Sequence, residues 1–269
     1  MRKHLSLAII VCLAGCVGRV PERSGERPTI VSLNPCTDAI LAEVADPAQL
    51  LAISHYSQDP RASSMDLSVA RRFRATGGTV EEVLVLDPDV VVAGTYLPSA
   101  TRTAFERFGI EVATIGIASS AAESEAQIAE LAALAGHSER GEALNARIEG
   151  AMASARWNGP KVSTLLWQEG GIVPGAATLI SGLLENAGFA SHSAARGLGQ
   201  GSYLPLERVL ADPPALVLAA SDERMLTHPV LRHLPKTQYA RLDSSLLYCG
   251  GPTIVRASAR LAQLRKAIG

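Results

Sequence analysis

Short apolar runs alternate along this chain with segments in which apolar residues recur at helical spacing. The runs are rich in valine, isoleucine and leucine, and glycine, proline or aspartate bounds most of them, which is typical of strands buried on both faces. This alternation predicts an α/β protein in which helices cover both faces of parallel sheets. Strands are predicted over residues 29–33, 49–54, 90–93, 111–115, 161–167, 216–220 and 239–242, and helices over 38–44, 79–86, 98–108, 178–186, 204–210 and 225–233 and after Pro252.

One helix–turn–strand unit occurs twice. Glu81-Glu-Val-Leu-Val-Leu-Asp-Pro-Asp-Val-Val-Val-Ala93 is matched by Glu207-Arg-Val-Leu-Ala-Asp-Pro-Pro-Ala-Leu-Val-Leu-Ala219. The two copies lie too far apart for a solenoid, whose repeats span ~20–50 residues. The repeat therefore predicts two similar lobes, each with a glutamate at the head of one helix. The alternative for each glutamate is a local role in stabilising its own helix, because a negative charge in the first turn interacts favourably with the helix dipole.

The segment between the lobes is almost entirely composed of helix-forming residues. It covers residues 119–157, is interrupted only near Gly136, and has no counterpart in either repeat. The interruption divides the segment in two, and the second part, from Ser138 to about Ala155, is predicted to be the single long helix that crosses between an N-terminal lobe (residues 29–118) and a C-terminal lobe (residues 158–269).

The start of the chain has the features of an export signal. Basic residues precede a largely apolar run from Leu5 to Leu13, which is too short for the ~20 residues that span a bilayer. Residues 1–15 are predicted to be a signal peptide and residues 16–28 a flexible tether. Leu13-Ala-Gly-Cys16 resembles the lipobox of bacterial lipoproteins, which implies lipid modification of Cys16; the alternative is an ordinary signal in which Cys16 is incidental.

Charge and motifs narrow the class of function. The net charge is −1 and no basic run occurs, which argues against nucleic-acid binding. The chain has no HExxH, Gly-x-Ser-x-Gly or Walker A motif, and its six histidines do not cluster, so an enzyme or a histidine-rich zinc or manganese binder is the weaker alternative.

Taken in order, these segments resemble the class III substrate-binding proteins of bacterial ABC importers, which bind ferric siderophores, haem or cobalamin. The resemblance rests on Arg27-Pro-Thr-Ile-Val-Ser-Leu-Asn34, on the two repeat units and on the linking segment, and it covers essentially the whole mature chain. It implies two Rossmann-like lobes joined by one inter-lobe helix, with the ligand in the cleft between them. It also implies that Glu81 and Glu207 dock onto the permease dimer.

Candidate ligand-binding residues follow from the rule that ligands bind beyond the carboxyl ends of parallel strands. Aromatic faces suit a large flat ligand, and several of the eleven aromatic residues fall at these ends. Trp167 could instead be an ordinary core residue, and His55 a structural one. The candidates are Asn34, Pro35, Cys36, His55, Tyr56, Tyr96, Trp167, Tyr203 and Cys249.

The two cysteines of the candidate set come from opposite lobes and have three possible states. They could be independent buried thiols, contacts to a metal centre or ligand, or a Cys36–Cys249 bridge that ties the lobes together and restricts opening.

The resulting expectation is a monomeric periplasmic protein, held at the membrane only through its lipid anchor. It would have no cofactor or structural metal of its own and would carry a metal chelate to an ABC permease. Arg61, Arg102 and Arg196 are the candidate cations, but nothing in the sequence directs them inward. This favours cobalamin slightly over a ferric siderophore or haem; the alternative is another small molecule or metal ion bound by the same fold.

Overall fold

A computed structural model describes residues 27–268. The signal peptide predicted at residues 1–15, the lipid site at Cys16 and all but the last two residues of the tether lie outside the described residues. No helix in the described part is long and apolar enough to cross a membrane.

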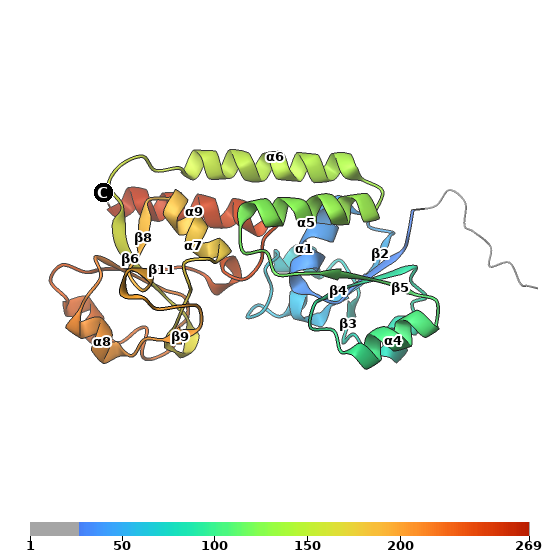
Figure 1. The fold of residues 1–269 in the computed structure, drawn as a ribbon, viewed down its shortest axis with the longest axis horizontal. Coiled ribbons are helices and arrows are strands. Elements are labelled where there is room, and N and C mark those ends of the chain that lie inside the picture. Colours follow the sequence, from blue (N-terminus) through green and yellow to red (C-terminus); the bar gives the residue numbers. More distant parts are fainter. Residues whose placement is uncertain (1–26, 269) are drawn as a thin grey trace, which may run out of the picture.

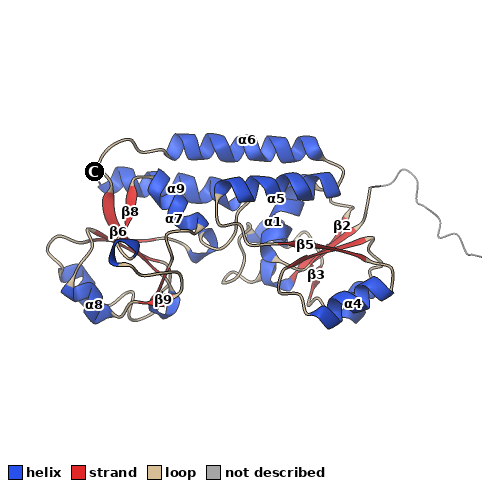
Figure 2. Ribbon diagram, viewed as in Figure 1, coloured by secondary structure: helices blue, strands red, loops and turns tan. Residues whose placement is uncertain are grey.

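The N-terminal lobe is built on a five-stranded sheet in the order β3-β2-β1-β4-β5, in which all neighbouring strands are parallel (Figures 1 and 2). Its elements are β1 (Ile30–Ser32), α1 (Pro35–Val44), β2 (Leu50–Ser54), α2 (Leu67–Ala70), β3 (Ala75–Thr76), α3 (Val80–Leu84), β4 (Val90–Gly94), α4 (Ser99–Arg107) and β5 (Glu111–Ile115).

The C-terminal lobe repeats this design with a four-stranded parallel sheet in the order β11-β10-β6-β8, beside a small antiparallel pair, β7 and β9. The predicted helix over 225–233 is wrong in extent: only a 3₁₀ turn at Pro229–His233 forms, because a residue before proline, here His228, favours extended backbone. The elements are β6 (Val162–Trp167), β7 (Ile172–Val173), α7 (Leu179–Asn186), β8 (Phe189–Ser191), β9 (Ser202–Tyr203), α8 (Leu206–Ala211), β10 (Leu216–Ala219), β11 (Gln238–Arg241) and α9 (Thr253–Ile268).

The apolar runs become strands because both faces of each sheet are covered. In β4, Val90 and Val92 enter one buried cluster, whereas Val91 and Ala93 enter another on the opposite face. The residues of β10 divide between two clusters in the same alternating way. A polar residue at any of these positions would be buried, which explains why the runs are continuous rather than alternating.

The repeated unit folds alike in both lobes. It forms α3, a turn and β4 in the first copy, and α8, a turn and β10 in the second. Glu81 is the second residue of α3 and Glu207 is the second residue of α8, so the two glutamates occupy equivalent positions.

The linking segment forms two helices, divided at the interruption that the sequence predicts near Gly136. α5 (Ala121–Leu134) ends where Gly136 adopts φ 74°, and the N–H groups of Gly136 and His137 donate to the carbonyl oxygens of Ala133 and Ala132. This C-terminal motif requires a left-handed residue, which glycine supplies without steric cost. α6 (Ser138–Ala155) then extends over both lobes, with α9 alongside it (Figure 1).

One hydrophobic core runs through both lobes. A single cluster of buried residues includes Ile30 of β1, Ile128 of α5, Ile148 of α6, Leu216 of β10 and Leu261 of α9. The lobes are therefore joined by packed apolar surface as well as by the covalent link through α6.

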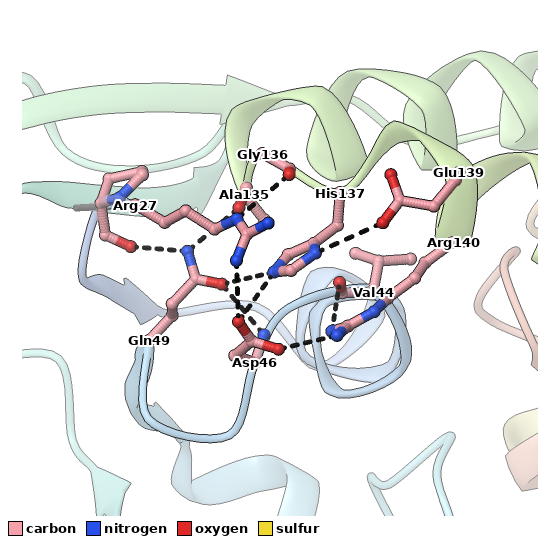
Figure 3. Close-up of polar contacts among 10 residues, drawn as sticks. Arg27, Val44, Asp46, Gln49, Ala135, Gly136, His137, Glu139 and Arg140 are labelled. Atoms are coloured by element: carbon pink, nitrogen blue, oxygen red, sulfur yellow. Dashed lines mark hydrogen bonds and ion pairs between the residues drawn. The ribbon is translucent and has the colours of Figure 1, made fainter. Parts of the chain in front are cut away.

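A polar network fixes the start of α6 to the N-terminal lobe (Figure 3). The buried His137 points its Nε2 at both Gln49 Oε1 and Asp46 Oδ2, each 3.0 Å away. Arg140 donates to Asp46 Oδ1 at 2.7 Å and to the carbonyl oxygen of Val44 at 3.2 Å. Gln49 also donates to the carbonyl oxygen of Ala135 at 3.0 Å, so the end of α5 belongs to the same network.

Replacing His137 with alanine should lower the free energy of unfolding by roughly 1–3 kcal/mol, because the change leaves buried polar groups without a partner. Urea denaturation measures the effect. His233→Ala, at an exposed position, is the matched control and should stay within about 0.5 kcal/mol of the parent protein. Equal stability of the two variants would show that the network does not anchor α6.

Candidate ligand-binding site

A pocket of about 540 Å³ lies between the two lobes. This volume is within the range of small-molecule sites, roughly 300–1,000 Å³. The C-terminal lobe supplies most of the wall from the carboxyl ends of β10 and β11, and the N-terminal lobe contributes the segment after the 3₁₀ turn His55–Gln58. The lining residues are Pro60, Arg61, Glu169, Ala220, Ser221, Asp222, Arg241, Leu242, Asp243, Ser244 and Arg260.

The order of strands explains why the pocket lies there. In the C-terminal sheet the connections reverse direction between β6 and β10, which lie side by side. The chain leaves these two strands in opposite directions, so a crevice opens beyond their carboxyl ends, where ligands bind in open α/β sheets. Glu169 follows β6 and Ser221 follows β10, so both line this crevice.

Three arginines line the pocket. Arg61 comes from the N-terminal lobe, and Arg241 and Arg260 from the C-terminal lobe. Arg241 pairs with Asp222, which raises the pKa of the guanidinium group. Arg260 donates to the carbonyl oxygen of Arg241 at 3.2 Å, and Arg61 pairs with its near neighbour Asp59 at 3.4 Å.

Sequence reasoning missed two of these arginines. Arg241 is the last residue of β11, so the strand-end rule could have identified it. Arg260 lies in the middle of α9 and carries no local signal, because only the docking of that helix brings it to the pocket. Of the other candidate cations, Arg102 donates to Thr114 Oγ1 at 2.7 Å and Arg196 pairs with Asp212, so neither lines the pocket.

Four of the five tyrosines are exposed at or near the strand ends. Tyr96, in the turn after β4, is 85% exposed, whereas Tyr56, Tyr203 and Tyr248 are exposed by 53–58%. Partial burial raises the pKa of Tyr248, and the nearby carboxylate of Glu169 adds to the increase. Exposed tyrosines are unusual in a chain with so few aromatic residues, and they offer flat faces to a ligand.

Tyr56 and His55 form a pair at the end of β2. Their ring centroids are 4.0 Å apart, and His55 Nδ1 lies 3.2 Å from the carbonyl oxygen of Thr76. His55 is exposed, and the backbone contact holds its ring through one nitrogen only.

Asn34 and Pro35 form the start of α1 at the end of β1. Asn34 Oδ1 accepts a hydrogen bond from the N–H of Cys36 at 2.8 Å and so caps the helix, and Pro35 occupies the first turn. These positions are at the predicted edge of the sheet, but the cap already uses the side-chain oxygen of Asn34.

The prediction that Trp167 contacts ligand is wrong for this structure. The side chain is fully buried in the C-terminal lobe, and its Nε1 donates to the carbonyl oxygen of Leu204 at 3.0 Å. Trp167 ends β6 as expected, but strands have two faces, and this residue points into the cluster that contains Val209 and Leu226.

The cysteines form a disulfide. Cys36 and Cys249 are bonded, with Cα atoms 5.1 Å apart. The interpretations as independent thiols or as thiolate ligands are therefore wrong for this structure, because neither sulfur retains a thiol group. The bridge, which was the remaining alternative, joins the two lobes next to the exposed Tyr248.

Glu81 and Glu207 are both exposed, and no hydrogen bond or ion pair engages either carboxylate among residues 27–268. Glu82 differs, because it accepts hydrogen bonds from Thr76 Oγ1 at 2.8 Å and from the N–H of Gly77 at 2.6 Å. These bonds lower the pKa of Glu82. Of the two adjacent glutamates, the one that matches the repeat is the one available to a partner.

Within the described residues, no group of three or more His, Cys, Asp or Glu side chains could hold a metal ion.

Known structures share this architecture. The haem-binding protein RhuT from Roseiflexus sp. RS-1 superposes with a TM-score of 0.68 at 21% identity, covering 90% of this chain and 98% of its own. The haem-binding protein HutB of Vibrio cholerae gives 0.71 at 18% identity, covering 88% and 98%. The vitamin B12-binding protein BtuF of Vibrio cholerae gives 0.67 at 16% identity, covering 89% and 97%. At these identities the likeness establishes the fold.

No curated protein sequence matches the chain. The family model described as "Periplasmic binding protein" matches residues 30–240, which include both sheets and the linking helices. The family and these structures are binding proteins rather than enzymes, and the location that the family indicates is the periplasm. The match over most of the chain, together with two parallel-sheet lobes joined by α6, identifies it as a member of class III of the periplasmic binding protein family.

Proposed function

We propose that this protein captures a metal chelate that carries carboxylate or other anionic groups, such as haem or a ferric siderophore, and delivers it to an ABC permease. The observation that carries the proposal is the pocket between the lobes, which three arginines line, and four of the five tyrosines are exposed. Arginine binds carboxylates through paired, charge-assisted hydrogen bonds, and tyrosine offers both a flat face and a phenolic oxygen.

The arginines change the preference that the sequence suggested. Cobalamin was favoured because no cation could be directed inward, but Arg61, Arg241 and Arg260 line the pocket. Acidic residues at the pocket, Glu169, Asp222 and Asp243, offset part of this charge. An anionic chelate would compete with Asp222 for Arg241 and gain a partner from the opposite lobe in Arg61.

The proposal extends to the partner and the anchor. Glu81 and Glu207 would dock onto cationic side chains of the permease, since they are exposed at equivalent positions of α3 and α8, one on each lobe. Lipid modification of Cys16 would hold a monomer at the membrane, within reach of that permease.

The ligand is identified by titrating the purified protein with haemin, a ferric catecholate siderophore and aquocobalamin, with absorbance and tryptophan fluorescence as readouts. We expect saturable binding of an anionic chelate. Arg241→Gln should weaken it roughly tenfold or more, because a charge-assisted hydrogen bond contributes about 1.5–3 kcal/mol. Tyr56→Ala and Tyr248→Ala should weaken it and change the absorbance of the bound chelate.

A matched control removes an arginine that does not line the pocket. Arg196→Gln removes the partner of Asp212 and should bind like the parent protein. Saturable binding of aquocobalamin alone would overturn the anionic-chelate proposal, and no saturable binding of any chelate would overturn the proposed ligand class.

A further inference from the structure

The disulfide connects elements that belong to different lobes and lie far apart in the chain. Cys36 is in the first turn of α1, directly after β1 of the N-terminal lobe. Cys249 follows β11 of the C-terminal lobe and precedes α9. The bond therefore crosses from one lobe to the other on the side where strands end and the pocket opens.

The residues around Cys249 are also bound to the N-terminal half by hydrogen bonds. The N–H of Gly251 donates to Ser124 Oγ of α5 at 2.7 Å, and Thr253 Oγ1 donates to the carbonyl oxygen of Ser64 at 3.1 Å. Arg256 donates to the same carbonyl oxygen. Two of these bonds are buried, so they are protected from competition with water.

Two glycines allow this close approach. A Cβ at Gly250 would lie 2.4 Å from Ser124 Oγ, and a Cβ at Gly251 would lie 2.6 Å from Ile40 Cγ1. Gly251 also has φ 62°, a conformation that favours glycine. The segment therefore rests directly on α1 and α5, with no room for a side chain between them.

From these contacts we infer that residues 248–256, which we name the strap, form a second connection between the lobes. The disulfide makes this connection covalent, and the connection sets the width of the cleft. The strap begins at Tyr248, whose carbonyl oxygen lies 3.9 Å from Cys36 Sγ, so the same connection fixes the backbone of that tyrosine. A hinge at α6 alone would leave the pocket side free to open. With the strap in place, both sides of the cleft are tied, and ligand enters and leaves through small local movements.

The consequence for binding rests on the proposed function. The apparent affinity of a protein falls in proportion to the fraction of molecules in the conformation that binds ligand. A site that is held in this conformation therefore keeps its full affinity. If the molecule without the disulfide is closed for about a tenth of the time, the chelate should bind roughly tenfold more weakly.

The test compares the parent protein with the Cys36→Ser/Cys249→Ser double variant by small-angle X-ray scattering and by amide hydrogen exchange, both without ligand. We expect a larger radius of gyration in the variant and faster exchange in residues 248–256 and at the start of α1. An equal radius together with no selective increase in exchange within the strap and α1 would overturn the inference. A bond that only stabilised the folded state would leave the radius unchanged and would speed exchange of the most protected amides throughout the protein.

Two further samples keep the test decisive if the double variant does not fold. Tris(2-carboxyethyl)phosphine reduces the bond in the folded parent protein: the sulfurs gain two electrons and two protons, and the phosphine becomes its oxide with oxygen from water. Thr253→Val/Arg256→Gln removes the bonds to Ser64 while the disulfide remains, and should loosen the strap less. Ser245→Ala, outside the strap, is the control.

Haemin is the probe for the binding consequence. We expect the parent protein to bind haemin and the double variant to bind it roughly tenfold more weakly. Equal affinity would overturn the claim that the strap positions the site. If neither protein binds haemin, the proposed ligand fails, and the scattering and exchange results still decide whether the strap holds the lobes.

Discussion

Reversing the charge of both Glu81 and Glu207 to lysine is expected to abolish uptake of the ligand and leave its binding unchanged. Both side chains are exposed, one on each lobe, at equivalent positions of α3 and α8. Two separated carboxylates fix the orientation of a docking surface and accelerate the encounter more than they add affinity. The rate of productive docking should therefore fall by roughly 10–1,000-fold, the range over which electrostatic steering acts.

Uptake is measured in membrane vesicles with the cognate permease, and binding by titration of the soluble variant. Glu111→Lys/Glu149→Lys is the matched control, since it makes the same change in net charge at exposed positions outside the repeats. A loss of binding equal to the loss of uptake would show that the glutamates support the fold or the pocket instead. Unchanged uptake would remove the docking role altogether.

Asp38→Asn is expected to stabilise the protein at neutral and alkaline pH. Asp38 is fully buried in α1, and this burial raises the pKa of its carboxyl group to about 8, although the nearby Ser32 hydroxyl and hydrogen bonds from Ser57 and Ser54 favour the charged form. The Ser57 hydroxyl and the Ser54 N–H both donate to Oδ2, at 2.6 and 3.0 Å, while Oδ1 has no partner among the described residues.

The direction of the pH effect follows from the raised pKa. Between the unfolded value of 3.8 and the folded value of about 8, the folded state binds more protons than the unfolded state. The free energy of unfolding therefore falls as pH rises through this window. The loss contributed by Asp38 between pH 5 and pH 8 is on the order of 3 kcal/mol, at about 1.4 kcal/mol for each pKa unit.

Urea denaturation from pH 5 to pH 8 measures this effect. The asparagine variant keeps a side-chain oxygen for Ser57 and Ser54 but cannot ionise, so its stability should vary less with pH. Glu111→Gln, which removes an exposed carboxylate, is the control and should follow the parent protein. A variant whose pH dependence equals that of the parent would show that Asp38 does not carry the buried proton.

The sequence was most informative where a pattern depends on local chemistry. The continuous apolar runs of β4 and β10 identify strands buried on both faces. The repeat singles out Glu81, and its neighbour Glu82 is the one that accepts hydrogen bonds from Thr76 and Gly77. The strand-end rule also found exposed residues, Tyr56 and Tyr96 among them, because parallel strands all end at one edge.

What could not be predicted depends on how distant segments dock. The rule identifies the edge of the sheet but not the face, so Trp167 seemed equivalent to Tyr56 although it is buried. The Cys36–Cys249 bond depends on the separation of the lobes, and Arg260 reaches the pocket only because α9 packs along α6. None of these distances is encoded in residues close together in the chain.

The buried cluster that passes through both lobes has a consequence for engineering. The chain looks like two halves that could be exchanged between relatives, each half bringing its own sheet. However, one buried cluster contains Ile30 of the N-terminal sheet, Leu216 of the C-terminal sheet, Ile148 of α6 and Leu261 of α9, so neither lobe closes its interior alone. A chimera joined at the lobe boundary would inherit two incomplete interiors, so a working exchange of ligand specificity must transplant the pocket residues rather than a whole lobe.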